Sequence, residues 1–218
     1  MHTRDNKNFR FISADRDIQS LDLIEQMLES EFPRISSDLG NPQADNKITV
    51  QIFPDLISFH SAIGIDNPQP WMIGDARPGL IRIVSPLNPG PRHSMESILQ
   101  CAIHEMAHVL TFFINFEIPS WLSEGIATWE AGQKERMDIV YKHLDQNNMP
   151  TFDDLNEFPC SYDVYPFSYS VIEFLKATYG FSKIIELVAD FSSPEKTLGK
   201  TLSEIREDWI EYLRKQKD

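Results

Sequence analysis

The chain has 218 residues, a length that suits one domain or one domain with two lobes. Apolar residues make up 41% and aromatic residues 11%, a composition typical of a folded protein and not of a disordered one. The formal net charge of −13 argues against nucleic acid as a partner, because binding phosphate groups needs clustered lysine and arginine side chains.

The N-terminal stretch contains no apolar core of a signal peptide, and no run of about 18 apolar residues would span a membrane. We therefore expect a cytoplasmic protein, although the mature form of a secreted protein is also compatible with the sequence. The two cysteines, Cys101 and Cys160, are too few for a disulfide framework. The oligomeric state stays open.

The first elements are a strand and a helix. Phe9–Ser13 alternates apolar and polar side chains, which predicts a short strand. Apolar residues then recur at helical spacing over residues 18–32, with Ser13 or Asp15 available as the cap. Pro33 is expected to interrupt this helix because proline lacks a backbone N–H group.

Three further strands are predicted before residue 90. The run KITVQIF, residues 47–53, is rich in β-formers, and a short helix ended by Gly64 follows it. Two more strands are predicted at Trp71–Gly74 and Leu80–Ser85, with DARPG between them as a hairpin turn.

From Ser94 onward the pattern is helical. One helix is predicted from Ser94 to about Asn115, and another begins at Pro119-Ser120 and runs through Ala131. Further helices are predicted at about 133–147, 166–179, 181–191 and 201–216.

Strands in the first part and helices in the rest predict an α+β fold. We expect a single domain over residues 1–218. Its N-terminal lobe, about 1–116, would hold a small mixed sheet with helices, and its C-terminal lobe, about 117–218, would be mostly helical. The active-site helix would lie at a cleft between the lobes.

The stretch AIHEMAHVL carries the motif H-E-x-x-H. His104 and His108 lie four residues apart, so one helical turn places both imidazoles on one face, close enough to share a metal ion. Glu105 projects about 100° around the helix from His104, where a general base for a metal-bound water is needed. The alternative is an ordinary amphipathic helix that happens to carry two histidines.

A catalytic zinc ion needs a third protein ligand and one open position. Glu124, in IPSWLSEGIATWE, lies one turn into the next predicted helix, which a short connection can turn back against the first. Its apolar neighbours indicate a buried turn, where a carboxylate is costly unless it is paired or bound to metal. Otherwise Glu124 is a surface carboxylate. Cys101 lies three residues before His104 and either packs or contributes a ligand.

His104-Glu105-x-x-His108 followed by Trp121-Leu122-Ser123-Glu124-Gly125 resembles the gluzincin metallopeptidases, the peptidase MA-like group related to thermolysin and the zinc aminopeptidases. This resemblance implies a zincin-like fold with one Zn²⁺ ion per chain. It implies that His104, His108 and Glu124 are the zinc ligands, and that Glu105 is the general base and acid.

Two departures from the family pattern concern the surroundings of the metal. Thr128 stands where thermolysin-like members have an aspartate that supports the first histidine. The G-x-M-E-N stretch with which the aminopeptidases recognise a free amine is absent from the sequence. The choice between endopeptidase and exopeptidase therefore stays open.

The resemblance also suggests residues that meet the substrate. A tyrosine near the start of the later helix would stabilise the oxyanion, and Tyr165 matches this position better than Tyr169; either could instead only pack. Ile81, Arg82 and Ile83 would belong to an edge strand that binds an extended peptide through its main chain. Arg82 could contact an acidic group of the substrate or be solvated.

These observations predict a zinc-dependent peptidase that acts on peptide or protein substrates. Zinc would polarise the scissile carbonyl and activate water, with Glu105 taking the water's proton. The alternative is a catalytically silent zinc-binding module of the same fold, acting in binding or regulation.

Overall fold

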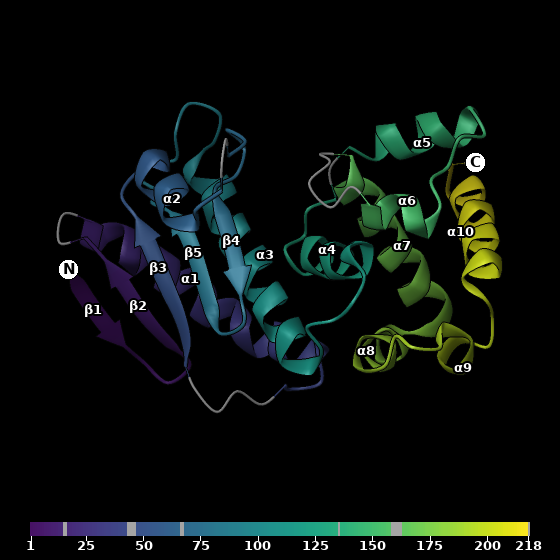
Figure 1. Ribbon diagram of the computed structural model, residues 1–218, viewed down its shortest axis with the longest axis horizontal. Coiled ribbons are helices and arrows are strands. Elements are labelled where there is room, and N and C mark those ends of the chain that lie inside the picture. The colour runs from purple at the N-terminus through teal and green to yellow at the C-terminus, as the bar shows by residue number, and fades with distance from the viewer. Residues whose placement is uncertain (15–16, 43–46, 66–67, 135, 158–162, 218) are drawn as a thin grey trace. The chain divides into compact units, whose positions relative to one another are not determined.

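The computed structural model describes residues 1–14, 17–42, 47–65, 68–134, 136–157 and 163–217. The chain divides into two compact units, Met1–Phe113 and Ile114–Asp218. The first unit contains a mixed sheet of five strands, and the second is mostly helical (Figure 1). The predicted α+β fold class is therefore confirmed.

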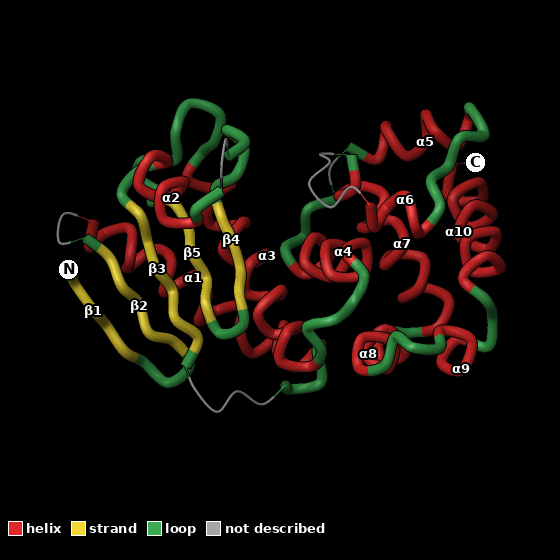
Figure 2. Tube along the Cα trace, viewed as in Figure 1, coloured by secondary structure: helices red, strands yellow, loops and turns green. Residues whose placement is uncertain are grey.

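The sheet has the strand order β1-β2-β3-β5-β4 (Figure 2). Strands β2, β3 and β5 run parallel to one another, and β1 and β4 pair antiparallel at the two edges. The bounds are His2–Asp5 for β1, Phe9–Ser13 for β2, Ile48–Phe53 for β3, Gly74–Arg77 for β4 and Leu80–Val84 for β5.

One face of the sheet forms the core of the first unit. Side chains alternate along a strand, so seven apolar residues of β2, β3 and β5 share this face. They are at most 4% exposed: Phe9, Phe11, Ile48, Val50, Ile52, Ile81 and Ile83. Helices α1, Ile18–Asp38, and α3, Met95–Ile114, cover this face (Figure 1). Phe32 of α1 meets Phe9 edge-on, with ring centroids 5.4 Å apart.

The opposite face mixes polar and apolar side chains and carries helix α2, Leu56–Ile63, whose Phe59 ring centroid lies 5.9 Å from that of Phe53 on β3. The Arg82 guanidinium donates to the Ala62 carbonyl at 3.0 Å, which places the end of α2 on this side. Asp55 caps α2 by accepting a hydrogen bond from the Ser58 backbone N–H at 2.8 Å, and Gly64 ends the helix in the left-handed region, with φ of 68°. The predicted stop at Gly64 is confirmed.

Helix α1 corrects the prediction that Pro33 interrupts it. The helix continues through Pro33 to Asp38, because the residues beyond the proline are anchored in the core: Ile35 is fully buried and Leu39 is 1% exposed. The residue at the N-cap position is Asp17. Ser13 is the last residue of β2, and Asp15 lies outside the described residues.

Two strands differ from their predicted positions. The strand predicted at Trp71–Gly74 is found at Gly74–Arg77, and its apolar part, Trp71–Ile73, precedes the strand. The run His2–Asp5 was not predicted, because its residues are mostly polar and it is a strand only through its pairing with β2. The strands predicted at residues 47–53 and 80–85 are confirmed within one residue.

Helix α3 is long and apolar enough to pass a test for membrane-spanning helices by length and composition. However, 56% of the apolar window is buried inside the protein, as is usual for a core helix. Its start agrees with the prediction, since the Ser97 backbone N–H donates to the Ser94 hydroxyl at 3.1 Å.

The second unit is built around helix α7, which packs against α4, α5, α6, α8 and α10. Trp209 of α10 donates through Nε1 to the Ser170 hydroxyl of α7 at 3.2 Å. The short helices α6 and α9 were not predicted. The bounds are Ser120–Glu130 for α4, Met137–Asp145 for α5, Phe152–Glu157 for α6, Val164–Tyr179 for α7, Phe181–Ala189 for α8, Pro194–Leu198 for α9 and Leu202–Lys217 for α10.

Candidate metal centre

Helix α3 carries the histidine pair and the neighbouring glutamate near its middle. His104, Glu105 and His108 are 8%, 7% and 7% exposed. The surrounding apolar residues of the helix, Ala102, Met106 and Val109, are fully buried and anchor it in the core of the first unit. The three polar side chains are therefore held on a rigid element, as a metal site requires.

Helix α4 carries Glu124, which is half-buried. The following residue, Gly125, brings α4 close to α7: a Cβ atom there would lie 2.7 Å from both the Ser168 carbonyl oxygen and Ile172 Cγ1. No residue with a side chain fits at this contact without displacing a neighbour. Gly125 thus fixes the turn of α4 that presents Glu124.

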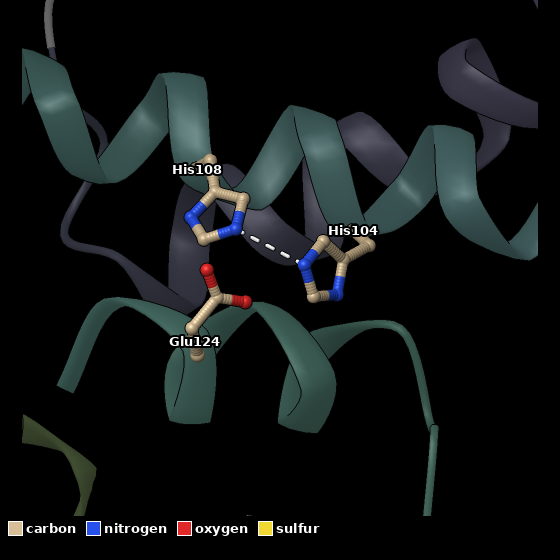
Figure 3. A group of neighbouring side chains, drawn as sticks. All are labelled: His104, His108 and Glu124. Atoms are coloured by element: carbon tan, nitrogen blue, oxygen red, sulfur yellow. Dashed lines mark hydrogen bonds between the residues drawn. The ribbon is translucent and has the colours of Figure 1, made fainter. Parts of the chain in front are cut away.

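His104, His108 and Glu124 come together in one group (Figure 3). One ligand atom from each lies within 4.8 Å of the other two. The two imidazole Nε2 atoms are 3.0 Å apart, and the rings meet nearly perpendicular, at 78°. Phe112 stacks on the His108 ring, with centroids 5.8 Å apart, and restricts its orientation.

This donor set fits zinc. Two imidazoles and one carboxylate are the ligands of a known class of catalytic zinc sites, which leave the fourth position for water or substrate. Zinc–nitrogen bonds of about 2.0–2.1 Å in a tetrahedron keep ligand atoms about 3.3 Å apart. The 3.0 Å between the two Nε2 atoms is close to this separation. All three ligand atoms lie within 4.8 Å of one another, so they would move together by at most about 1.5 Å to bind one zinc ion.

Thr128 has a local role in α4. Its hydroxyl donates to the backbone carbonyls of Glu124 and Gly125, at 2.7 and 3.0 Å. It is 2% exposed. The hydroxyl therefore bonds to its own helix in the position where thermolysin-like enzymes have an aspartate.

The carboxylate of Glu105 lies against Cys101 and Gly74. The Cys101 thiol donates to Glu105 Oε1 with an Sγ–Oε1 distance of 3.6 Å. A Cβ atom on Gly74 would lie 2.7 Å from the same oxygen. Among the described residues Cys101 does not join the group of metal-ligating atoms, which contains His104, His108 and Glu124.

Gly74 was not predicted to lie near the site. Its position depends on how β4 pairs with β5, and a glycine between an apolar stretch and a turn has no local signal for such a contact. The pairing of Gly74 with Ile83 is the feature that places it on the covered face, facing α3.

The two tyrosines differ in their surroundings. Tyr169 is 7% exposed, its ring packs on Trp129 with centroids 5.4 Å apart, and Lys134 Nζ lies over the ring at 5.9 Å from its centroid. Burial, with a smaller contribution from Glu173, raises the pKa of Tyr169. Tyr165 lies on the first turn of α7 and is half-buried.

The prediction that Leu80–Val84 is an edge strand is wrong. Strand β5 pairs with β3 on one side and β4 on the other, so its main chain is already hydrogen-bonded on both sides. Ile81 and Ile83 are fully buried on the covered face. Arg82 is paired within the protein: its Nε donates to the Asp75 carboxylate at 2.9 Å, and its side chain is 13% exposed.

Comparison of the sequence with protein-family models finds no matching family, and comparison with curated proteins finds no matching relative. The inference of a metal centre therefore rests on the geometry of His104, His108 and Glu124.

Proposed function

We propose that the protein is a zinc-dependent peptidase. The observation that carries this proposal is the group formed by His104, His108 and Glu124, whose ligand atoms lie within 4.8 Å of one another. A zinc ion bound by two histidines and one glutamate, with a glutamate directly after the first histidine, is the arrangement of the metalloproteases with an H-E-x-x-H helix.

The general base in this proposal is Glu105. Zinc held by the three ligands would polarise a peptide carbonyl and lower the pKa of a water molecule to about 7. Glu105 accepts the proton of this water and passes it to the leaving amine. A site without catalysis has no need for this carboxylate, which is buried to 7% exposure beside the first metal-ligating histidine.

The edge strand beside Glu105 is β4, and it supports a peptide as the substrate. Gly74, the first residue of β4, faces Glu105, and within the described parts of the chain β4 pairs with one strand, β5. An extended peptide can add to such an edge through main-chain hydrogen bonds. The scissile bond would then pass close to the base.

Tyr165 is the proposed oxyanion donor. It lies one turn before Ser168, whose backbone contacts Gly125, the residue after Glu124. Tyr169 is the less suitable candidate because its ring already contacts both Trp129 and Lys134. The phenol O–H of Tyr165 would donate to the developing oxyanion.

The proposal is tested by metal analysis together with a cleavage screen on a mixed peptide library. We expect one zinc ion per chain, cleavage of some of the peptides, and loss of both in His108→Ala. The same substitution at His2, on β1, is the matched control and should change neither. Zinc at one per chain without cleavage of any peptide would instead support a catalytically silent zinc-binding module.

A further inference from the structure

The carboxylate of Glu105 is held from two directions inside the first unit. From its own helix, Cys101 lies one turn earlier, and its thiol donates to Oε1 across 3.6 Å. From the sheet, the backbone of Gly74 approaches the same oxygen. Glu105 is only 7% exposed, so these contacts are largely shielded from water.

Gly74 provides the room for this arrangement. A Cβ atom at this position would lie 2.6 Å from Cys101 Sγ, 2.7 Å from Glu105 Oε1 and 2.9 Å from Glu105 Cγ. These distances are shorter than real Cβ contacts, so any side chain at residue 74 would displace the thiol and the carboxylate together. The glycine is needed for space between the strand and the helix.

Holding one carboxylate oxygen restricts the orientation of the whole side chain. A glutamate side chain has three rotatable bonds, and fixing them before the reaction removes an entropic cost from the transition state. A thiol is a weak hydrogen-bond donor, so the expected gain in rate from this contact is modest.

We propose that Cys101 is a positioning residue for the general base: its thiol holds Oε1 of Glu105, in a space that Gly74 keeps open. This inference rests on the proposed peptidase function. It assigns Cys101 neither a metal-ligating nor a substrate-binding role.

The hydrogen bond is tested by infrared spectroscopy of the zinc-loaded protein, because the S–H stretching band reports whether a thiol donates. The background is Cys160→Ala, which leaves Cys101 as the only thiol in the chain. Replacing the acceptor with Glu105→Ala should move the band to higher wavenumber. An unchanged band would overturn the hydrogen bond, whatever the protein's activity.

The positioning role is tested by steady-state kinetics on a cleaved peptide. Cys101→Ala should lower kcat about three- to tenfold, the range expected for losing one hydrogen bond, with KM and zinc content unchanged. Cys101→Ser keeps a donor and should recover most of the loss. Cys160→Ala is the matched control and should leave kcat unchanged.

Gly74→Ala provides a second test from the opposite side of the carboxylate. The added methyl group should lower kcat by about tenfold or more, with one zinc ion per chain retained. If this variant does not fold, the pair of Cys101 variants still decides the question.

The outcomes separate the two proposals. A band that responds to Glu105→Ala, together with unchanged kcat in Cys101→Ala, would overturn the positioning role and leave the peptidase intact. A wild-type protein that binds zinc and cleaves no peptide would overturn the peptidase, and the positioning role with it.

Discussion

Three polar residues in the middle of α3 differ in their surroundings because a helix turns about 100° per residue. His104 and His108 are one turn apart and join Glu124 in the metal group. Glu105 points elsewhere, toward Cys101 and Gly74. The helix therefore separates two ligands from a base within five consecutive residues.

The first prediction concerns the base. Glu105→Ala should keep one zinc ion per chain and lower kcat by about a hundred- to ten-thousandfold, because the proton transfer loses its positioned acceptor while the ligands stay in place. Metal analysis and peptide cleavage on the same preparation measure both effects. Turnover at the wild-type rate in this variant would contradict the proposed mechanism.

The metal group could be predicted from the sequence because its signal is local. His104 and His108 are related by one helical turn, and Glu124 lies one turn into the next helix. The contact between Gly74 and Glu105 could not be predicted in this way. It depends on the register of β4 against β5 and on the position in which α3 packs on the sheet, and neither leaves a pattern in the residues near Gly74.

The packing of α4 on α7 at Gly125 positions the ligand Glu124. Gly125→Ala should lower the free energy of unfolding by about 1–3 kcal/mol, because the added methyl group overlaps the Ser168 carbonyl oxygen and Ile172 at 2.7 Å. It should also weaken zinc binding, since the preceding residue is the ligand Glu124. Thermal unfolding and zinc titration against a competing chelator measure the two effects. A more stable variant with unchanged zinc affinity would show that α4 and α7 have room to separate.

Helix α10 offers a test of acid sensitivity. The Glu204 backbone N–H donates to the Thr201 hydroxyl at 3.2 Å, and the Glu204 carboxylate accepts from the Thr201 backbone N–H at 2.8 Å. This backbone donor, followed by the Thr201 hydroxyl, lowers the pKa of Glu204. The carboxylate thus stabilises the fold above its unfolded pKa of about 4.3, and this contribution is lost as pH falls through the lower folded value.

We therefore expect wild type to unfold at a higher temperature than Glu204→Gln at about pH 7, and the difference to shrink toward about pH 3. The same substitution at Glu207, an exposed residue of α10, is the matched control for removing one carboxylate charge from this helix. A difference in unfolding temperature between wild type and Glu204→Gln that stays constant with pH would contradict the lowered pKa of Glu204.

Elements were predictable where their stability comes from their own residues. Asp55 and Gly64 mark the ends of α2 in the sequence as well as in the structure. Strand β1 was missed because its stability comes from β2, and α1 was predicted too short because buried Ile35 outweighs the lost hydrogen bond of Pro33. Long-range packing overrode the local signal in both cases.

For the whole molecule, the fold class followed from the order of the elements, with strands first and helices after. The strand order did not follow, because β4 lies outside β5 although it precedes it in the chain. The prediction that β5 is an edge strand came from the resemblance to thermolysin-like enzymes, and the residues of β5 do not show how many strands it pairs with. β5 pairs with β4 on one side and with β3 on the other. The partner β3 is distant in the sequence, since it ends at Phe53 and β5 begins more than 25 residues later, at Leu80.

Removal of the metal should affect the whole molecule. A ligand that binds only the folded state raises the free energy of unfolding, by about 2.7 kcal/mol at a hundredfold excess over Kd. Treatment with a chelator should therefore lower the thermal unfolding midpoint, and added zinc should restore it. Glu124→Gln, which weakens the metal group, should show a smaller shift. An identical midpoint with and without chelator would argue against a resident metal ion.

The contact between Gly125 and Ser168 also has a consequence for the order of events during synthesis. Both histidines and Glu124 leave the ribosome before α7, yet α4 packs on α7 and gains its position from that contact. A growing chain that stops short of residue 164 has all three ligands but lacks the surface that presents the third. We expect tight metal capture to wait until residues 164–179 have emerged, so a bound ion would mark a chain in which α4 has already packed on α7.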